Sequence, residues 1–275
     1  MFARITLIAF VFALVGCGAG RTTFARYPAA AAAFDRAGSD PKAVEIADRV
    51  IAAAGGQDKW NAVKQVRWSE SVTVGEGKPP ITFDEAWDRW NGRHYQRIRA
   101  EAGDVVVMRS LYEASGTAYH QSGSATQTLP RADRDGAMSN ARERWEFDTG
   151  LLLTPFLLEA PGVKLTMIGE VPGEAGQPPL DDLKVTFDPK DPTRTATIHA
   201  IVNRGTNQID RIEIVKAGDP DTKRIGYKAS SWVDVGALKL ATVYQNIGVA
   251  AEVVTFSKLE AAPEADETLY VPVVQ

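Results

Sequence analysis

The chain has 275 residues, a formal net charge of −4 at pH 7 and a single cysteine. This slightly acidic balance, without a basic stripe, argues against nucleic acid as a partner, because phosphate backbones are bound by clustered Lys and Arg. A lone cysteine excludes a disulfide within one molecule, and the length suits one large β domain or two small ones.

The N-terminal segment has the pattern of a bacterial export signal. Arg4 supplies a positive charge, and an almost wholly apolar run covers residues 5–15. The run has the length of a signal-peptide core and is too short to span a bilayer as a helix. It ends in Leu14-Val15-Gly16-Cys17, which resembles the lipobox of bacterial lipoproteins. The resemblance implies a signal peptide over residues 1–16 and an acyl chain such as palmitate on Cys17, the mature N-terminus.

An ordinary secretory signal with an incidental cysteine is the alternative. An unpaired thiol is unusual in an exported protein unless it is used chemically, and lipidation uses it. Acyl chains also give stable anchoring, because each buried methylene contributes about 0.8 kcal/mol. We therefore expect a protein that is lipid-anchored to a bacterial membrane and faces the periplasm. Gly18 stands where an aspartate would favour inner-membrane retention in enteric bacteria, so the outer membrane is the favoured destination.

Two helices are predicted after the export signal. An Ala-rich segment, residues 17–40, is typical of a flexible tether. Asp40 then suits a helix N-cap, Pro41 suits the first turn, and Gly55-Gly56 suits the end of the helix. A second, short helix is predicted over residues 58–64.

From residue 66 the apolar period changes to two, which is typical of strands. A strand at 66–74 and its return strand are joined by a loop at 75–80. Asn91-Gly92 is a two-residue hairpin signal, and it sets Trp90 opposite Arg93. Further strands are predicted at 105–109 and 117–121.

A helical insertion near 131–160 interrupts the strands and carries an apolar run at 151–158. Strands then return at 163–170, 183–188, 196–202, 208–216, 224–234, 238–246, 253–259 and 270–273. Tight turns between them indicate an antiparallel meander, and an open sheet of about a dozen strands curls because its twist accumulates. The predicted fold class is mainly β (α+β). It is a large curved antiparallel sheet forming an unclosed half-barrel, with helices packed in or over its concave face, over residues 41–275.

Two segments resemble the LolA-like superfamily of periplasmic domains. The first is residues 44–56, followed by Trp60, and the second is the late hairpin 224–241 with a Val-Asp-Gly type turn. The superfamily includes the outer-membrane lipoprotein carrier and its lipoprotein receptor. The resemblance implies an unclosed barrel with a helical lid over an apolar cavity that accepts acyl chains.

Signatures of catalysis are largely missing. The sequence has no G-x-S-x-G elbow, no H-E-x-x-H and no P-loop, so we expect neither an enzyme nor a cofactor. His94, His120 and His199 fall on different predicted strands. We interpret them as three half-exposed strand residues and expect no metal. A His₃ metal site is the alternative.

Two glutamates are predicted to face each other on a largely apolar face of the sheet. If the loop between the first two strands is symmetric, Glu70 lies opposite Glu85 and Trp68 opposite Trp87, with Arg109 on the same face. Opposed carboxylates on such a face are costly unless they are paired or solvated. Arg109 can neutralise one of them, and the cluster can hold a lipid head group or a partner. A register slip by one residue, or a sheet end open to water, is the alternative.

The apolar candidates for an acyl pocket are Trp68, Trp87, Trp145, Leu152 and Phe156. Core packing explains the same residues equally well. The leading expectation is a membrane-anchored, non-catalytic protein that binds a lipid or the acyl chain of a lipoprotein. The alternative is an interaction module with a filled barrel that docks another envelope protein. A third hypothesis is an accessory domain of a hydrolase, although the chain has no room for a catalytic domain.

Overall fold

The structure, a computed structural model, describes residues 34–271 except 76, 114, 174, 175, 177 and 192. The predicted signal peptide, the predicted lipidation site Cys17 and residues 17–33 of the predicted tether lie outside the described residues. Within the described ranges, no helix has the length and apolar character needed to cross a membrane.

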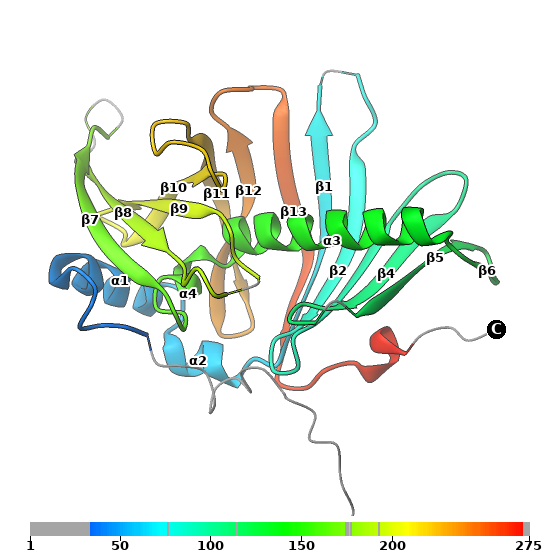
Figure 1. Cartoon of the computed structure of the whole chain (residues 1–275). Coiled ribbons are helices and arrows are strands. Elements are labelled where there is room, and N and C mark those ends of the chain that lie inside the picture. Colours follow the sequence, from blue (N-terminus) through cyan, green and yellow to red (C-terminus); the bar gives the residue numbers. More distant parts are fainter. Residues whose placement is uncertain are drawn as a thin grey trace, which may run out of the picture.

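Thirteen strands form one antiparallel sheet in the order β6-β5-β4-β3-β2-β1-β13-β12-β11-β10-β9-β8-β7. The two halves of the chain meet where β1 pairs with β13, and β6 and β7 are the two outer edges, so the sheet does not close (Figure 1). This confirms the predicted unclosed half-barrel. The strands are β1 (Gln65–Val74), β2 (Ile81–Asp88), β3 (Arg93–Ile98), β4 (Asp104–Ser110), β5 (Gly116–Ser122), β6 (Ala125–Thr128), β7 (Lys164–Val171), β8 (Leu180–Thr186), β9 (Thr197–Asn203), β10 (Gln208–Val215), β11 (Ile225–Val235), β12 (Leu238–Asn246) and β13 (Glu252–Ala262).

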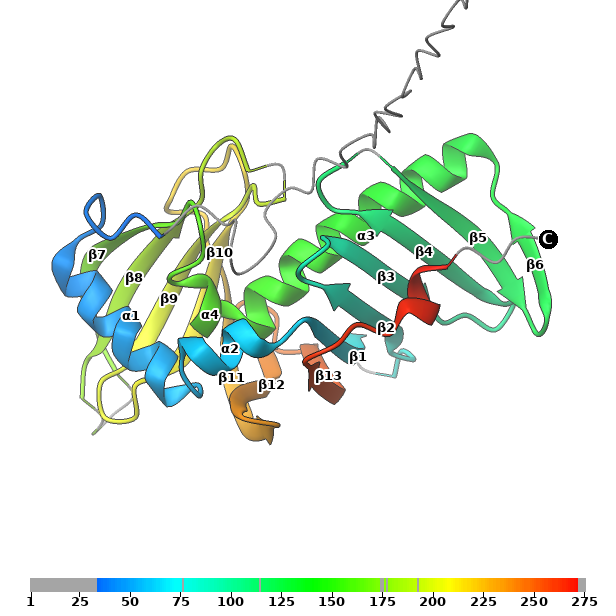
Figure 2. The same cartoon turned by 90° about the horizontal axis from the view of Figure 1, so that it is seen from below.

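The helices lie on one face of this sheet, which we call the inner face. They are α1 (Pro41–Ala53), α2 (Gln57–Ala62), α3 (Arg131–Leu152) and α4 (Thr154–Leu157). A short 3₁₀ helix near the end of the chain, η1 (Glu267–Tyr270), lies apart from them beside β3. The long helix α3 crosses the strands from β5 to β12, and α1, α2 and α4 lie beside the half that carries β7 to β10 (Figures 1 and 2). The prediction of a strand at 270–273 is wrong for Tyr270, because this residue belongs to η1. Residues 272–275 lie outside the described part of the chain.

The start of α1 follows the predicted capping. The Asp40 side chain accepts a hydrogen bond from Lys42 N, and Pro41 occupies the first turn. The residues just before the helix are held by the edge strand β7, because Leu165 O accepts from Asp40 N (2.9 Å) and Ser39 Oγ accepts from Leu165 N (3.0 Å). The buried face of α1 consists of Ala43, Val44, Ile46, Ala47, Val50 and Ile51, all of which belong to the main hydrophobic core.

The predicted register of the β1–β2 hairpin is wrong by two residues. Glu70 pairs with Phe83, and Trp68 pairs with Glu85. Pro79 and Pro80 have no N–H to donate, so β2 begins only at Ile81. A shift of two residues leaves every side chain on its predicted face, because side chains alternate with a period of two.

The turn between β2 and β3 is also wider than predicted. Asp88 pairs with Arg93 across a four-residue loop, in place of the pairing of Trp90 with Arg93. The buried Asp88 carboxylate accepts from the backbone N–H groups of Trp90 and Asn91 (both 3.1 Å). The Asp88 side chain therefore supplies hydrogen-bond acceptors for these two N–H groups of the loop. In a two-residue turn, backbone carbonyls of the ladder would have been their acceptors.

Candidate functional site

Three buried carboxylates meet between α3 and the inner face of the sheet. Glu70 comes from β1, Glu85 from β2 and Asp148 from α3, and one oxygen of each lies within 4.8 Å of the others. Their residues are 1 %, 3 % and 0 % exposed. We call Glu70, Glu85 and Asp148, together with Arg144, the polar cluster. The two glutamates predicted to lie together do so, although they are not directly paired in the ladder.

The cation of the polar cluster is Arg144, not the predicted Arg109. Arg144 Nε lies 2.9 Å from Glu70 Oε2 and 2.8 Å from Asp148 Oδ1, and its Nη2 contacts Glu70 Oε1. Arg109 donates instead to two backbone carbonyls, those of Ser110 (3.2 Å) and Met138 (2.5 Å). Arg109 thus holds the N-terminal half of α3 against β4, while Arg144 neutralises the carboxylates.

Neutral partners complete the surroundings of Glu85. Gln96 Nε2 donates to Glu85 Oε1 (2.9 Å), and His94 Nε2 shares a hydrogen bond of 2.8 Å with Glu85 Oε2. Burial raises the pKa of Glu85 to about 7, and burial also raises the pKa of Asp148 well above its ordinary value. Burial, with the nearby charge of Arg109, lowers the pKa of His94 to about 3, so the imidazole is neutral at pH 7.

The polar cluster can hold a proton between Glu85 and Asp148, and it anchors α3 to β1 and β2. Three carboxylate oxygens are also ligands that a divalent cation accepts. However, the guanidinium of Arg144 already contacts Glu70 and Asp148 and supplies the positive charge there. The arrangement therefore fits an internal anchor better than a metal centre.

The predicted lining of an acyl pocket is packed core in this structure. Trp68, Trp145, Leu152 and Phe156 are at most 2 % exposed, and Trp87 is 9 % exposed. Trp87 meets Trp145 edge-on with ring centroids 5.2 Å apart, and Phe156 stacks on another buried ring, Trp60, at 4.7 Å. Side chains fill the space between α3, α4 and the sheet at these positions.

A pocket of about 330 Å³ lies along the C-terminal half of α3, where the helix faces β9, β10 and the loop before β9. We call it the helix pocket. Its apolar walls are Phe147, Gly150, Phe187, Ala196, Ile198, Ile214 and Ala217, and its polar lining is Arg142, Glu143, Glu146, Arg194, Thr195 and Lys216. None of Trp87, Trp145, Leu152 and Phe156 lines it.

Arg194 is the unusual member of the helix pocket, because it is a cation that is only 7 % exposed. Its guanidinium lies over the ring of Trp145, 4.4 Å from the centroid, and 5.7 Å from that of Phe187. Nη1 donates to Glu146 O (3.1 Å). Burial lowers the pKa of Arg194 to about 10, so the group remains charged at neutral pH.

The Glu146 carboxylate is already engaged beside Arg194. It accepts from Ala196 N (2.9 Å) and from Thr195 Oγ1 (3.1 and 3.2 Å). These bonds fasten the loop before β9 to α3. Glu146 keeps its negative charge while it makes these bonds, and with Asp191 it partly offsets the positive charge of Arg194.

The histidines differ from the sequence interpretation. His94 and His199 are fully buried, not half-exposed, and only His120 is partly exposed. His199 Nδ1 lies 2.8 Å from Asp182 Oδ1, and its Nε2 lies 3.1 Å from Asp221 Oδ1. Carboxylates on neighbouring elements thus engage both nitrogens of His199 and Nε2 of His94, whereas His94 Nδ1 is buried without a hydrogen-bond partner among the described residues.

Sequence reasoning missed Arg194, Asp148 and the role of Arg144. The spacing of Arg144 and Asp148, four residues apart on a predicted helix beside Trp145, is a signal for an ion pair on a buried face. Arg194 follows an Asp-Pro turn and has no local pattern that distinguishes it from a surface arginine. Only its packing against Trp145 identifies it.

No protein-family model matches the chain, and no curated protein matches it. Among solved structures, it is similar to a DUF1329 family protein from Desulfovibrio piger (11% identity, TM-score 0.49, 85% of this chain and 98% of that one). It is also similar to a LolA superfamily protein from Nitrosomonas europaea (9% identity, TM-score 0.49, 84% of this chain and 97% of that one). A third similar structure is a putative outer membrane lipoprotein-sorting protein domain from Vibrio parahaemolyticus (7% identity, TM-score 0.44, 84% of this chain and 96% of that one).

Proposed function

We propose that this protein is a non-catalytic, membrane-anchored protein of the bacterial envelope that binds the acyl chain of an anionic lipid or lipoprotein in the helix pocket. It would face the periplasm, held through lipidated Cys17 to the outer membrane. The observation that carries the proposal is the buried cation of Arg194 among the apolar walls of the helix pocket. The binding place differs from the one predicted from the sequence, because Trp87, Trp145, Leu152 and Phe156 pack as core.

The chemistry of the helix pocket matches a molecule with an apolar chain and a negative head. Phe147, Ile198 and Ile214 offer apolar surface, whose removal from water drives binding. Arg194 offers charge-assisted hydrogen bonds to a carboxylate or phosphate, which are stronger than neutral ones and stronger still where water is excluded. A volume of about 330 Å³ is at the lower end of the range for small-molecule sites and suits part of one acyl chain.

A series of fatty acids of increasing length tests this proposal in solution. Each added methylene should lower Kd about fourfold, corresponding to about 0.8 kcal/mol, until the pocket is full and Kd reaches a plateau. Fatty alcohols of the same lengths lack the charge and should bind more weakly. The Arg194→Met variant, which keeps an apolar side chain against Trp145, should bind acids and alcohols alike.

A matched pair of variants locates the binding site. A Cβ on Gly150 would meet only Ile198 Cδ1, at 3.6 Å, so Gly150→Ala fits without moving a neighbour and should retain binding. Gly150→Met would project a longer chain into the helix pocket and should abolish binding of the fatty acids. If both variants bind like the wild type, the acyl chain does not occupy this pocket.

The second candidate function is a protein-interaction module without a lipid ligand. It is favoured by the filled inner face, where Trp68, Trp145 and Phe156 are nearly inaccessible. Mass spectrometry of the protein after mild extraction distinguishes the two: a stoichiometric lipid, retained by wild type and absent from Gly150→Met, supports lipid binding. If the protein retains no lipid and binds no fatty acid, the result supports the protein-interaction module.

A further inference from the structure

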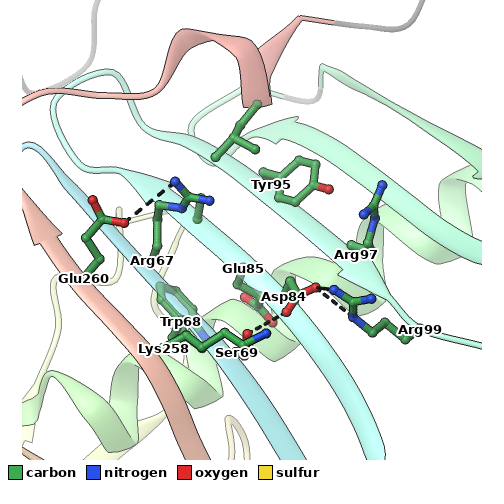
Figure 3. A pocket seen from close by; sticks show the side chains of 12 residues that line it. Arg67, Trp68, Ser69, Asp84, Glu85, Tyr95, Arg97, Arg99, Lys258 and Glu260 are labelled. Carbon is green, nitrogen blue, oxygen red and sulfur yellow. Dashed lines mark hydrogen bonds and ion pairs between the residues drawn. The ribbon is translucent and has the colours of Figure 1, made fainter.

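A second pocket lies on the outer face of the sheet, on the opposite side from α3 and the helix pocket. It has a volume of about 380 Å³ and is lined from β13, β1, β2 and β3 and by η1 (Figure 3). We call it the outer pocket. Ala86 helps to make it: this small residue is paired in the ladder between the long side chains of Arg67 and Tyr95, which leaves a depression between them.

The outward-facing lining of the outer pocket holds more cations than carboxylates. Its outward-facing charged lining comprises the cations Arg67, Arg97, Arg99 and Lys258 and the carboxylates Asp84 and Glu260. Asp84 is already engaged, since it accepts from Ser69 Oγ (2.6 Å) and from Arg99 Nε (2.8 Å). Arg67 Nη1 lies 3.7 Å from the nearest Glu260 oxygen and 3.6 Å from Asp266 Oδ2, both longer than a hydrogen bond. Arg97 Nε lies 3.4 Å from Asp104 Oδ2, outside the pocket.

Lys258 is placed over this pocket by an irregularity in β13. Arg67 pairs with Glu260 while Ser69 pairs with Ser257, so β13 contains an extra residue opposite β1. Lys258 lies in this bulge with φ of 50°, a conformation that non-glycine residues rarely adopt. Such bulges re-aim side chains, and Figure 3 shows Lys258 extending across the sheet toward Asp84. Among the described residues its ammonium has no hydrogen bond and no ion pair within 4 Å, although its charge helps to lower the pKa of Asp84.

We infer that the outer pocket binds the phosphate group of an organic phosphate ester through Lys258, Arg67 and the neighbouring guanidinium groups. Arginine and lysine are the side chains that recognise phosphate, through bidentate hydrogen bonds and a point charge respectively. Tyr95 and Leu269 add an aromatic and an aliphatic wall for the organic part of the ester. The volume exceeds what a bare phosphate ion requires and falls within the range of small-molecule sites.

One phosphate chemistry can come from two sources, a soluble phosphomonoester or the head group of a phospholipid. Glycerol 3-phosphate and dihexanoylphosphatidylglycerol, the latter below its micelle concentration, are suitable probes for calorimetric titration of the full chain. The test variants are Lys258→Gly, which suits the positive φ while removing the ammonium, and Arg67→Gln. Lys190→Gln removes an exposed positive charge from a loop outside the pocket and serves as the control.

The expected result is that Kd for at least one probe rises about tenfold or more in Lys258→Gly and in Arg67→Gln, and is unchanged in Lys190→Gln. An effect on glycerol 3-phosphate identifies a soluble ester, and an effect on the short-chain lipid alone identifies a lipid head group. Gly150→Met should leave this dependence intact, which separates the outer pocket from the helix pocket. The inference is overturned if neither probe binds, or if both test variants bind like Lys190→Gln.

Discussion

Replacing Glu85 by glutamine should remove a pH dependence of stability that originates in the polar cluster. The carboxyl is fully buried, and Gln96, His94 and Asp148 surround it. Glutamine has nearly the same shape and mimics the neutral acid at every pH. It should therefore keep the contacts of the protonated form while removing the ionisation.

The magnitude follows from the raised pKa. Burial raises the pKa of Glu85 from 4.5 to about 7, so the folded protein holds this proton more tightly than the unfolded chain. Its stabilisation is fully present below pH 4.5 and is lost as the pH rises through 7. A change of this size corresponds to about 3 kcal/mol in the free energy of unfolding. Glu85→Gln should match wild type near pH 4.5 and exceed it by up to about this amount near pH 8.

Urea unfolding followed by tryptophan fluorescence measures the effect at a series of pH values. Burial also raises the pKa of Glu159 to about 7, but that group is present in both proteins and cancels in the difference. Burial and the neighbouring Glu85 raise the pKa of Asp148, so the difference reports Glu85 together with its effect on Asp148. Glu143→Gln is the control, because it removes the same charge from an exposed position on α3. It should follow the wild-type curve.

Two outcomes would refute this reasoning. Wild type and Glu85→Gln would lose stability in parallel above pH 5 if the carboxyl were hydrated and ionised normally. Alternatively, Glu85→Gln would be less stable than wild type at every pH if the ionised carboxylate, and not the neutral acid, made the stabilising contacts of Glu85. In either case the polar cluster would be an ordinary network of ion pairs.

Two further predictions concern α3 and the end of α1. Arg144→Met should destabilise the protein by about 3–5 kcal/mol in urea unfolding, because it leaves Glu70 and Asp148 buried without a cation. Adding Glu70→Gln should recover part of this loss. A loss of stability below about 1 kcal/mol in Arg144→Met would mean that water reaches the polar cluster. Gly55→Ala should lower the melting temperature more than Gly56→Ala does. Both glycines have positive φ, but only at Gly55 would a Cβ meet the β11–β12 turn, 2.3 Å from a backbone carbonyl oxygen. Equal losses in the two variants would contradict this close approach.

Local features of the sequence determined where elements begin and which way their side chains face. Asp40 and Pro41 predicted the start of α1 because capping involves only neighbouring residues. Alternation placed Glu70 and Glu85 on one face even though their predicted pairing was wrong, because a two-residue shift preserves the face of every side chain. The meander of short strands likewise predicted an open antiparallel sheet.

The tertiary structure decided the partners of these side chains. Arg144, not Arg109, neutralises the glutamates because the docking of α3 brings it over β1, and no local pattern encodes that docking. Packing also decided that the predicted acyl lining became core and that Arg194 came to lie over Trp145. The direction of a side chain follows from local backbone geometry and can be predicted from one strand or helix. The environment that sets charge pairing and cavities is assembled from segments far apart in the chain, so it exists only once they have packed.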